Sequence, residues 1–429
     1  MLSIEDNEAL CRVGPGTLMG NMFRQYWLPA ATSAELPSPD CPPLRVRLLA
    51  EDLIAFRTTS GAVGMMQNSC PHRGASMFFG RNEEEGLRCV YHGWKFDTTG
   101  ACVDMPSEPA ESNFKTKVRA RSYPCIDRNG VIWCYMGPDA VPPPLPELEG
   151  NMTADCQVTV LYRANNWMQG IEGELDTIHA AFLHGGANQA RSFEPGTFGY
   201  YQSRSRDGKF SVRDTDYGTS YGMYRDAEED SHYWRIGHLL FPCYAMPPGA
   251  STLGNDARFL AYVPMDDYNT LEWSVGRRDP SIQAQGQFGR EYVPNGTGWL
   301  ERFRIEQNEA NDYKIDREAQ STWKSYTGIA GIRQQDMAMT ETMGPIMNRS
   351  REHLGTTDAL IIRTRRKMMA SAKALEEHGL APPGVDTPAA YHQRSGGIVL
   401  PRSADWWEST RELREKFEAG KARVEVPAS

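Results

Sequence analysis

The stretch that decides the fold is Cys70-Pro-His72-Arg-Gly-Ala, followed, with sixteen residues between His72 and Cys89, by Cys89-Val-Tyr-His92-Gly-Trp-Lys-Phe. Each of these two short segments supplies one thiol and one imidazole, so two loops provide four metal-binding side chains. At the Cys and His content of this chain, both pairs in this order and spacing arise by chance in about one chain in ten thousand. The sequence therefore predicts a metal centre held by two loops.

The spacing also bears on which metal is held. Zinc is the alternative, because two Cys and two His suit a tetrahedral zinc site. Zinc fingers, however, pair Cys with Cys and His with His along the chain, whereas each loop here offers one of each. That order is the one expected of a Rieske [2Fe-2S] centre, in which two Cys hold one iron and two His hold the other. We predict Cys70, His72, Cys89 and His92 as the cluster ligands, and we interpret the other cysteines as core thiols.

Strand-forming residues surround these loops. Runs rich in β-branched and aromatic residues, punctuated by Gly and Asn-Gly, extend from about Leu44 to Met136 and predict a small all-β domain. The Pro-rich passage Pro138–Pro146 can continue neither a sheet nor a helix, so we expect a boundary there. The predicted organisation is an N-terminal segment packing on the body (1–40), a Rieske domain (41–146) and a mixed α+β domain with a C-terminal helical tail (151–429).

A second candidate metal site opens the large domain. Its segment is Asp176-Thr-Ile-His179-Ala-Ala-Phe-Leu-His184, which overlaps the stretch 165–183, where apolar residues at helical intervals and the lack of Pro predict a helix. A lone pair of histidines at this spacing is weak evidence, but two imidazoles and a carboxylate would give Fe(II) the open positions that O2 activation needs. On a helix, Asp176 would share a face with His179 and could accept its second ring N–H.

The chain as a whole resembles the Rieske non-haem iron aromatic ring-hydroxylating oxygenases, in particular the oxygenase components of the phthalate 4,5-dioxygenase type. The matching segments include both Cys/His loops, Asp176 to His184, Arg12-Val-Gly-Pro-Gly, and Arg24-Gln-Tyr-Trp-Leu-Pro. The resemblance implies a helix-grip (START/Bet v 1-like) catalytic domain with an antiparallel sheet, so that the fold class is α+β. It also implies that His179 and His184 hold a mononuclear Fe(II).

The same resemblance supplies the third iron ligand and the path of the electrons. In Gln335-Asp336-Met-Ala-Met-Thr-Glu341, Asp336 is the expected ligand and Glu341 the fallback. Asp176 is expected to bridge His179 to His92 of the partner subunit, which implies a trimer or a pair of stacked trimers. We predict a separate flavin or iron-sulfur reductase as electron donor, since the chain has no convincing flavin or nicotinamide motif.

Relatives of this type act on anionic aromatic substrates, which requires a cation inside an acidic protein. We expect hydroxylation of an aromatic carboxylate with O2, and keep O-demethylation of methoxylated aromatic acids as the alternative. Residues alone do not separate these two reactions. An alternative of another class is a pure Rieske electron carrier. The candidate substrate-binding residues are Arg204, Arg206, Arg235 and His238.

Composition excludes several partners. The 429 residues include 46 Lys and Arg against 55 Asp and Glu, so the net charge is -9 and no overall basic field attracts nucleic acid or anionic lipid. The acidic N-terminus is unlike a signal peptide, and no apolar run is long enough to span a membrane. The odd number of scattered cysteines, nine, argues against a disulfide framework. We therefore expect a cytoplasmic protein.

Overall fold

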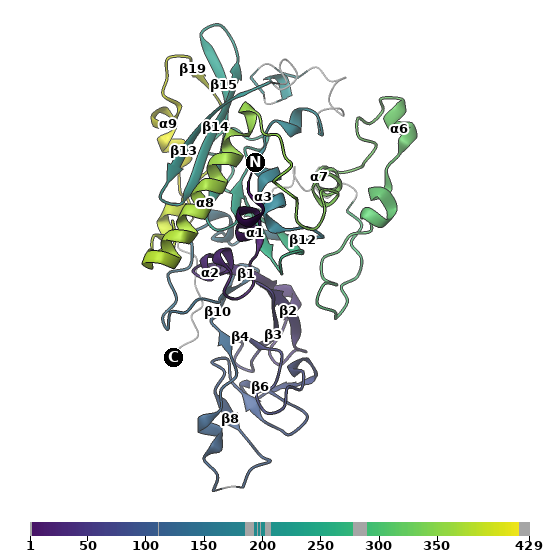
Figure 1. Cartoon of the computed structure of the whole chain (residues 1–429), viewed down its shortest axis with the longest axis vertical. Helices are drawn as coiled ribbons and strands as arrows, with labels where there is room; N and C mark the ends of the chain where they lie inside the picture. The colour runs from purple at the N-terminus through teal and green to yellow at the C-terminus, as the bar shows by residue number, and fades with distance from the viewer. Residues whose placement is uncertain are drawn as a thin grey trace.

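The computed structural model describes residues 2–109, 111–184, 193–194, 196–197, 199–201, 207–277 and 290–419. Two of the predicted substrate-binding residues, Arg204 and Arg206, lie outside these ranges. The described chain is elongated, with small sheets at its narrow end and a large sheet covered by helices at its wide end (Figure 1). Within the described residues, no helix has both the length and the apolar character needed to cross a membrane.

Small antiparallel sheets make up the narrow end. The two loops with Cys and His belong to this part: Cys70 follows β4, and Cys89 lies between β6 and β7. One sheet has the order β2-β3-β4-β9, a second β5-β6-β7-β8, and a third β1-β11-β10. The strands are β1 (Trp27–Thr32), β2 (Leu44–Leu48), β3 (Glu51–Arg57), β4 (Val63–Gln67), β5 (Arg81–Glu83), β6 (Gly86–Arg88), β7 (Lys95–Phe96), β8 (Cys102–Asp104), β9 (Ser122–Tyr123), β10 (Cys125–Arg128) and β11 (Val131–Tyr135).

The wide end is built on one antiparallel sheet with the order β12-β18-β17-β16-β15-β14-β13, and β19 also pairs with β15. Its central strand β15 is buried over most of its length, so both of its faces are covered. The strands are β12 (Cys156–Arg163), β13 (Lys209–Thr215), β14 (Gly218–Asp226), β15 (Ser231–Leu240), β16 (Tyr244–Met246), β17 (Phe259–Pro264), β18 (Thr270–Arg277) and β19 (Gly396–Pro401).

Helices cover this sheet. The long helix α8 packs against β13 and β14, and α3 packs against β15, β16 and β17 (Figure 1). On the other face of β15, Trp406 stacks on Trp234 with ring centroids 5.6 Å apart. The α-helices are α1 (Ile4–Cys11), α2 (Leu18–Phe23), α3 (Trp167–Leu175), α6 (Arg317–Ser321), α7 (Ile332–Glu341), α8 (Ala359–His378), α9 (Trp406–Ser409) and α10 (Arg411–Arg414).

The β1-β11-β10 sheet joins the two ends. Buried side chains of β1 and β11 belong to the same hydrophobic cluster as those of β16, β17 and β18. Polar contacts tie the ends as well: Tyr244 donates to the backbone carbonyl of Trp27, and Arg302 pairs with Glu35 at 2.6 Å. The predicted α+β fold, with an all-β part and an antiparallel sheet gripped by helices, is confirmed. The N-terminal segment also contributes strand β1, which pairs with β11 in the β1-β11-β10 sheet.

Candidate metal centres

The two Cys/His loops have nearly the same backbone. In the first, the Cys70 N–H donates to the Ala75 carbonyl at 2.8 Å, and the Gly74 N–H donates to the Cys70 carbonyl at 2.9 Å. In the second, Cys89 donates to Trp94 at 2.8 Å, and Gly93 donates to Cys89 at 2.9 Å. Both glycines have positive φ, 77° and 82°, a conformation that other residues adopt only with strain. Each loop, Cys70 to Gly74 and Cys89 to Gly93, therefore folds into a tight turn, and the two turns face each other.

The loops bring like ligands together. The rings of His72 and His92 lie 4.4 Å apart between centroids, and His72 stacks on Trp94 at 4.3 Å. The thiols of Cys70 and Cys89 are both buried and interact with each other, and burial raises the pKa of Cys70 to about 11. The Nδ1 atom of His72 is buried and, among the residues that the structure describes, has no hydrogen-bond partner. A buried, unpartnered ring nitrogen and a buried thiol pair are what a metal cluster would satisfy.

This arrangement does not suit one zinc ion. A tetrahedral zinc ion draws all four ligand atoms around one point, within about 4 Å of one another. Throughout the described residues, only His179, His184 and Asp336 form a group of three or more His, Cys, Asp or Glu ligand atoms that lie within 4.8 Å of one another. The Cys pair and the His pair therefore stand apart, as they do when each pair binds its own iron in a [2Fe-2S] cluster.

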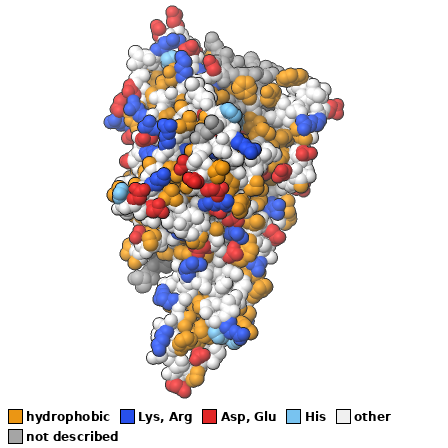
Figure 2. All heavy atoms as spheres, viewed as in Figure 1, with side chains coloured by type: hydrophobic (Ala, Val, Ile, Leu, Met, Phe, Trp, Pro, Cys, Tyr) orange, Lys and Arg blue, Asp and Glu red, His pale blue; other side chains and the backbone are white. Residues whose placement is uncertain are grey.

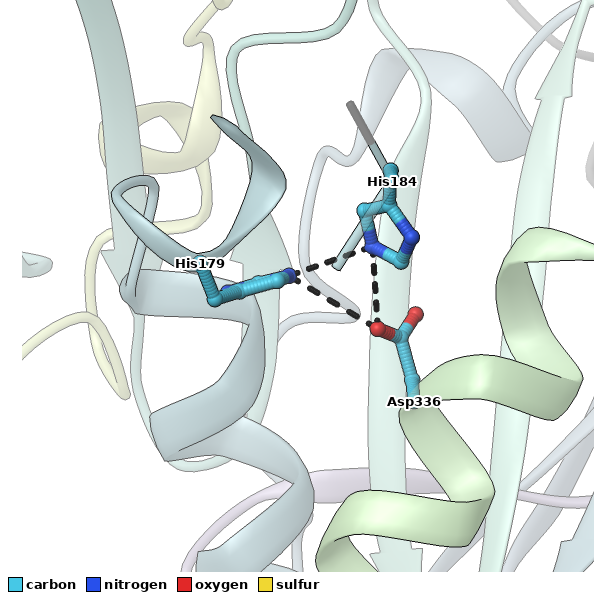
Figure 3. A group of neighbouring side chains, drawn as sticks. All are labelled: His179, His184 and Asp336. Atoms are coloured by element: carbon cyan, nitrogen blue, oxygen red, sulfur yellow. Dashed lines mark hydrogen bonds and ion pairs between the residues drawn. The ribbon is translucent and has the colours of Figure 1, made fainter. Parts of the chain in front are cut away.

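His179, His184 and Asp336 converge in the large domain (Figure 3). The Nε2 atoms of the two histidines are 3.2 Å apart, and Asp336 Oδ1 lies 3.0 Å from His184 Nε2 and 3.6 Å from His179 Nε2. Two imidazoles and one carboxylate on one side of a single point leave the other side open. This is the ligand set of non-haem Fe(II) oxygenases, so the residues fit a mononuclear iron.

Local structure differs here from the helix that periodicity predicts for 165–183. Helix α3 ends at Leu175, and His179 lies in the 3-10 turn His179–Ala181. Asp176 makes this turn, because its Oδ1 accepts hydrogen bonds from the Ile178 N–H at 2.8 Å and the His179 N–H at 3.4 Å. Asp176 Oδ2 is 3.6 Å from His179 Nδ1. The expected pairing of Asp176 with His179 is thus present, but a capped turn produces it rather than a continuous helix.

Helix α7 brings Asp336 to the histidines and supplies a neighbouring cation. Arg333, one turn earlier, lies 3.7 Å from Asp336 Oδ2 and also pairs with Glu272 and Glu174. Burial raises the pKa of Asp336, but the neighbouring His184 ring and the charge of Arg333 outweigh it and hold the pKa below its ordinary value. Asp336 is therefore ionised at neutral pH, with Oδ1 toward the histidines and Oδ2 toward Arg333.

Sequence reasoning missed Gln335. Its side-chain oxygen lies 2.7 Å from His184 Nδ1, and its nitrogen donates to Thr327 Oγ1 at 3.0 Å and to the Ile329 carbonyl at 2.9 Å. Its position next to the expected ligand Asp336 was the one sequence feature that pointed to Gln335. Its partners Thr327 and Ile329 lie in a loop whose position cannot be predicted from the sequence.

The fallback ligand Glu341 is placed elsewhere. It follows Asp336 by more than one helical turn, accepts hydrogen bonds from the Tyr313 hydroxyl at 2.6 Å and the Ala164 N–H at 3.2 Å, and is not part of the metal-binding group. Glu341 therefore holds α7 against the segments that carry Tyr313 and Ala164.

The substrate candidates on β15 face opposite ways. Arg235 is buried, and its Nε donates to Thr177 Oγ1 at 2.9 Å, which places a guanidinium beside the Asp176–His179 turn. His238, three residues further, faces the other side of the strand. Its ring nitrogens contact the Tyr217 hydroxyl at 3.2 Å and the Arg394 carbonyl at 3.1 Å, and burial lowers its pKa to about 3. The prediction for His238 is corrected: it is a neutral core histidine.

Two further side chains on the Arg235 face were not predicted. Arg225 and Tyr221 lie on β14, in register with Tyr233 and Gly237 of β15, so they share the face of Arg235. Both are buried, and in the described part of the chain Arg225 Nη1 and the Tyr221 hydroxyl have no hydrogen-bond partner. Burial, together with the charge of nearby Arg225, lowers the pKa of Arg235 to about 10.

A fold with a Rieske-type cluster domain and a helix-grip domain that carries two histidines and one carboxylate defines the class of Rieske non-haem iron oxygenases. Family models agree: residues 26–124 match the Rieske [2Fe-2S] domain, and residues 134–426 match the LigXa C-terminal domain like family. The chain therefore belongs to the Rieske-type aromatic oxygenase subunits. Members of this class carry a Rieske [2Fe-2S] cluster and use a mononuclear iron at the catalytic site.

Several characterised relatives cover nearly the whole chain. The 3-chlorobenzoate-3,4-dioxygenase oxygenase subunit of Comamonas testosteroni is 43% identical over 95% of this chain and 97% of its own length. The phthalate 4,5-dioxygenase oxygenase subunit of Pseudomonas putida is 35% identical, over 88% and 87%. The 5,5'-dehydrodivanillate O-demethylase oxygenase subunit of Sphingobium sp. is 33% identical, over 86% and 80%.

Solved structures show the same fold. Dicamba monooxygenase bound to dicamba superposes with a TM-score of 0.57 at 18% identity, covering 83% of this chain and 99% of that one. The family-model matches and the relatives that cover most of the chain confirm the predicted family and the oxygenase activity.

Proposed function

We propose that this oxygenase component hydroxylates an aromatic carboxylate, with a mononuclear Fe(II) held by His179, His184 and Asp336. The convergence of these three side chains is the observation that carries the proposal (Figure 3). We assign the [2Fe-2S] cluster to Cys70, Cys89, His72 and His92. When bound, the cluster supplies single electrons and the iron supplies the means to activate O2. The chain's own residues hold both groups and orient the substrate.

Buried cations on the face of Arg235 support an acidic substrate. Arg235 and Arg225 are both buried guanidiniums whose side-chain Nε atoms donate to neutral oxygens, those of Thr177 and the Asp207 backbone. Burying cations is costly unless an anion or hydrogen-bond acceptor joins them. A substrate carboxylate would satisfy the Arg225 Nη1 and Tyr221 hydroxyl groups that lack partners in the described part of the chain. Arg204 and Arg206 stay in the proposal as predictions from the sequence.

We propose that electrons reach this site from another subunit. Figure 1 shows the β5-β6-β7-β8 sheet at one end of the molecule and α3 and α7 in the other half, so the two metal centres of one chain are well separated. Hydrophobic side chains gather at the surface of the narrow end (Figure 2), where Phe79, Val90 and Tyr91 are 65%, 56% and 58% exposed. An exposed apolar patch beside His92 suits contact with another subunit.

Asp176 is the proposed link across that contact. Its side chain is 38% exposed, while one of its oxygens faces His179. It can therefore accept a hydrogen bond from His92 of the partner subunit. A heterologous contact of this kind forms a ring when the rotation between subunits closes, and we propose such a ring here, a trimer or two stacked trimers. All nine cysteines are free, which suits a reducing cytoplasm. We propose a separate flavin or iron-sulfur reductase as the electron donor.

Ring dihydroxylation is the main proposal, because the dioxygenase relative for 3-chlorobenzoate shares the most identity and coverage among those described. O-demethylation is the second candidate, because the O-demethylase relative also covers most of the chain. The test is a single turnover: the holoprotein is reduced with dithionite and mixed with ¹⁸O2 and either 3-chlorobenzoate or a methoxybenzoate. Dihydroxylation predicts a diol carrying two ¹⁸O atoms from 3-chlorobenzoate. Formaldehyde from the methoxybenzoate, with no diol from 3-chlorobenzoate, would instead establish the demethylase.

A further inference from the structure

The hydrogen bonds of Gln335 determine which ring nitrogen of His184 carries the proton. An amide side chain has one accepting oxygen and one donating nitrogen, so its orientation follows from its partners. The Ile329 carbonyl, 2.9 Å away, can only accept. The atom of Gln335 facing Ile329 must therefore be the nitrogen, and the oxygen must face His184 Nδ1 at 2.7 Å.

Thr327 is consistent with this orientation. Its hydroxyl is within 3.3 Å of the Ile329 carbonyl, to which it can donate, and its oxygen receives the Ile329 N–H at 3.1 Å. The oxygen can also accept from the Gln335 nitrogen, 3.0 Å away. A two-residue relay thus runs from the backbone of the loop before α7 to the ring of His184.

Because an amide oxygen only accepts, His184 Nδ1 must carry the hydrogen, and the lone pair of the neutral ring is then on Nε2. That nitrogen is the one that faces Asp336 Oδ1 at 3.0 Å and His179 Nε2 at 3.2 Å. Hydrogen bonds of this kind fix the tautomer and the ring orientation of a metal-binding histidine.

We infer that Gln335 is a positioning residue: the backbone carbonyl of Ile329, acting through the Gln335 amide, holds His184 as the tautomer whose Nε2 lone pair points at the metal. This inference rests on the proposed iron site. It also distinguishes the two histidines, because a partly exposed carboxylate, Asp176, faces His179, whereas a neutral amide faces His184. The amide supports His184 without adding a second charge beside Asp336.

The test measures Fe(II) affinity of the intact holoprotein by competition with a ferrous chelator, with the visible spectrum of the [2Fe-2S] cluster as a check on folding. Gln335→Met keeps the length of the side chain and removes the acceptor. We expect Fe(II) affinity to fall by about 10- to 100-fold. Gln335→Glu keeps an acceptor for His184 Nδ1 and should stay within a few-fold of the parent. Gln320→Met, the same change on the surface of α6 where Gln320 contacts Arg317, should leave the affinity unchanged.

Rescue by glutamate separates positioning from stability. A carboxylate at 335 faces the Ile329 carbonyl without a donor, so Gln335→Glu should unfold at least as readily as Gln335→Met while binding Fe(II) more tightly. If Gln335→Met loses its cluster spectrum, Gln335→Asn, one methylene too short to span both partners, replaces it in the comparison. Parental affinity in the Met variant, or equal losses in the Glu and Met variants, overturns the inference. Failure of the parent itself to bind Fe(II) would instead overturn the proposed iron site.

Discussion

Replacing Arg235 tests whether the buried cations recognise a substrate carboxylate. Arg235 lies on β15 with its Nε 2.9 Å from Thr177 Oγ1, beside the turn that carries His179. The Arg235→Leu substitution removes the guanidinium and leaves an apolar side chain in its place. A hydrogen bond to a charged group contributes about 1.5–3 kcal/mol, and about 1.4 kcal/mol changes an affinity tenfold. The dissociation constant of an aromatic acid should therefore rise by about 10- to 150-fold.

The assay is isothermal titration calorimetry of the holoprotein with 3-chlorobenzoate and with its uncharged amide. Binding of the acid should weaken in Arg235→Leu, while binding of the amide should change little. Arg402→Leu, which removes an arginine whose side chain is 50% exposed, is the matched control and should bind both compounds as the parent does. Equal weakening for acid and amide would show a loss of pocket shape. An unchanged affinity for the acid would refute carboxylate recognition by Arg235.

Three further changes test other parts of the account. Asp176→Asn removes the charge facing His179 and should lower the turnover rate by about 10- to 100-fold, measured as reductase-driven O2 consumption, while iron content per chain stays at the parental value. Glu341→Ala leaves the Tyr313 hydroxyl and the Ala164 N–H without their acceptor and should cost about 2–5 kcal/mol in urea unfolding, with Fe(II) binding unaffected; loss of the iron would instead make Glu341 a ligand. Glu172 is largely shielded from solvent, which raises its pKa, but Arg349 and Arg365 outweigh this effect and lower it. Its ionisation therefore stabilises the fold above its ordinary pKa of about 4.3, and this stability is lost as the pH falls through the lowered pKa. Urea unfolding between pH 7 and pH 3 should show a shallower pH dependence in Glu172→Gln, and an equal slope would contradict this role.

Features that depend on local spacing could be predicted from the sequence. The two cluster loops place their ligands through turns only a few residues long, and His179 and His184 lie in one short segment. Asp336 is more than 150 residues from His184, so only the family resemblance pointed to it, and the structure brings it to 3.0 Å from His184 Nε2.

Other features depend on register and on distant loops. The hydrophobic pattern predicted a helix that continues through His179. The pattern carries no information on side-chain hydrogen bonds, and in the structure the Asp176 side chain caps a new turn where α3 ends. His238 was paired with Arg235 as a substrate residue, although three residues along a strand reverse the face. The role of Gln335 depends on its hydrogen bond to Ile329, and that of Arg225 on sharing a sheet face with Arg235. Neither relation can be predicted from the residues next to Gln335 or Arg225 in the sequence.

The central claim is that one chain binds a [2Fe-2S] cluster and a separate Fe(II) at His179, His184 and Asp336. The most direct measurement is iron content together with the electron paramagnetic resonance spectrum of the dithionite-reduced protein, for the parent and for Asp336→Ala. The account predicts a Rieske signal in both proteins, with about three irons per chain in the parent and about two in the variant. Equal iron content in the two proteins would contradict the assignment of Asp336, and a colourless protein containing zinc would contradict the whole account.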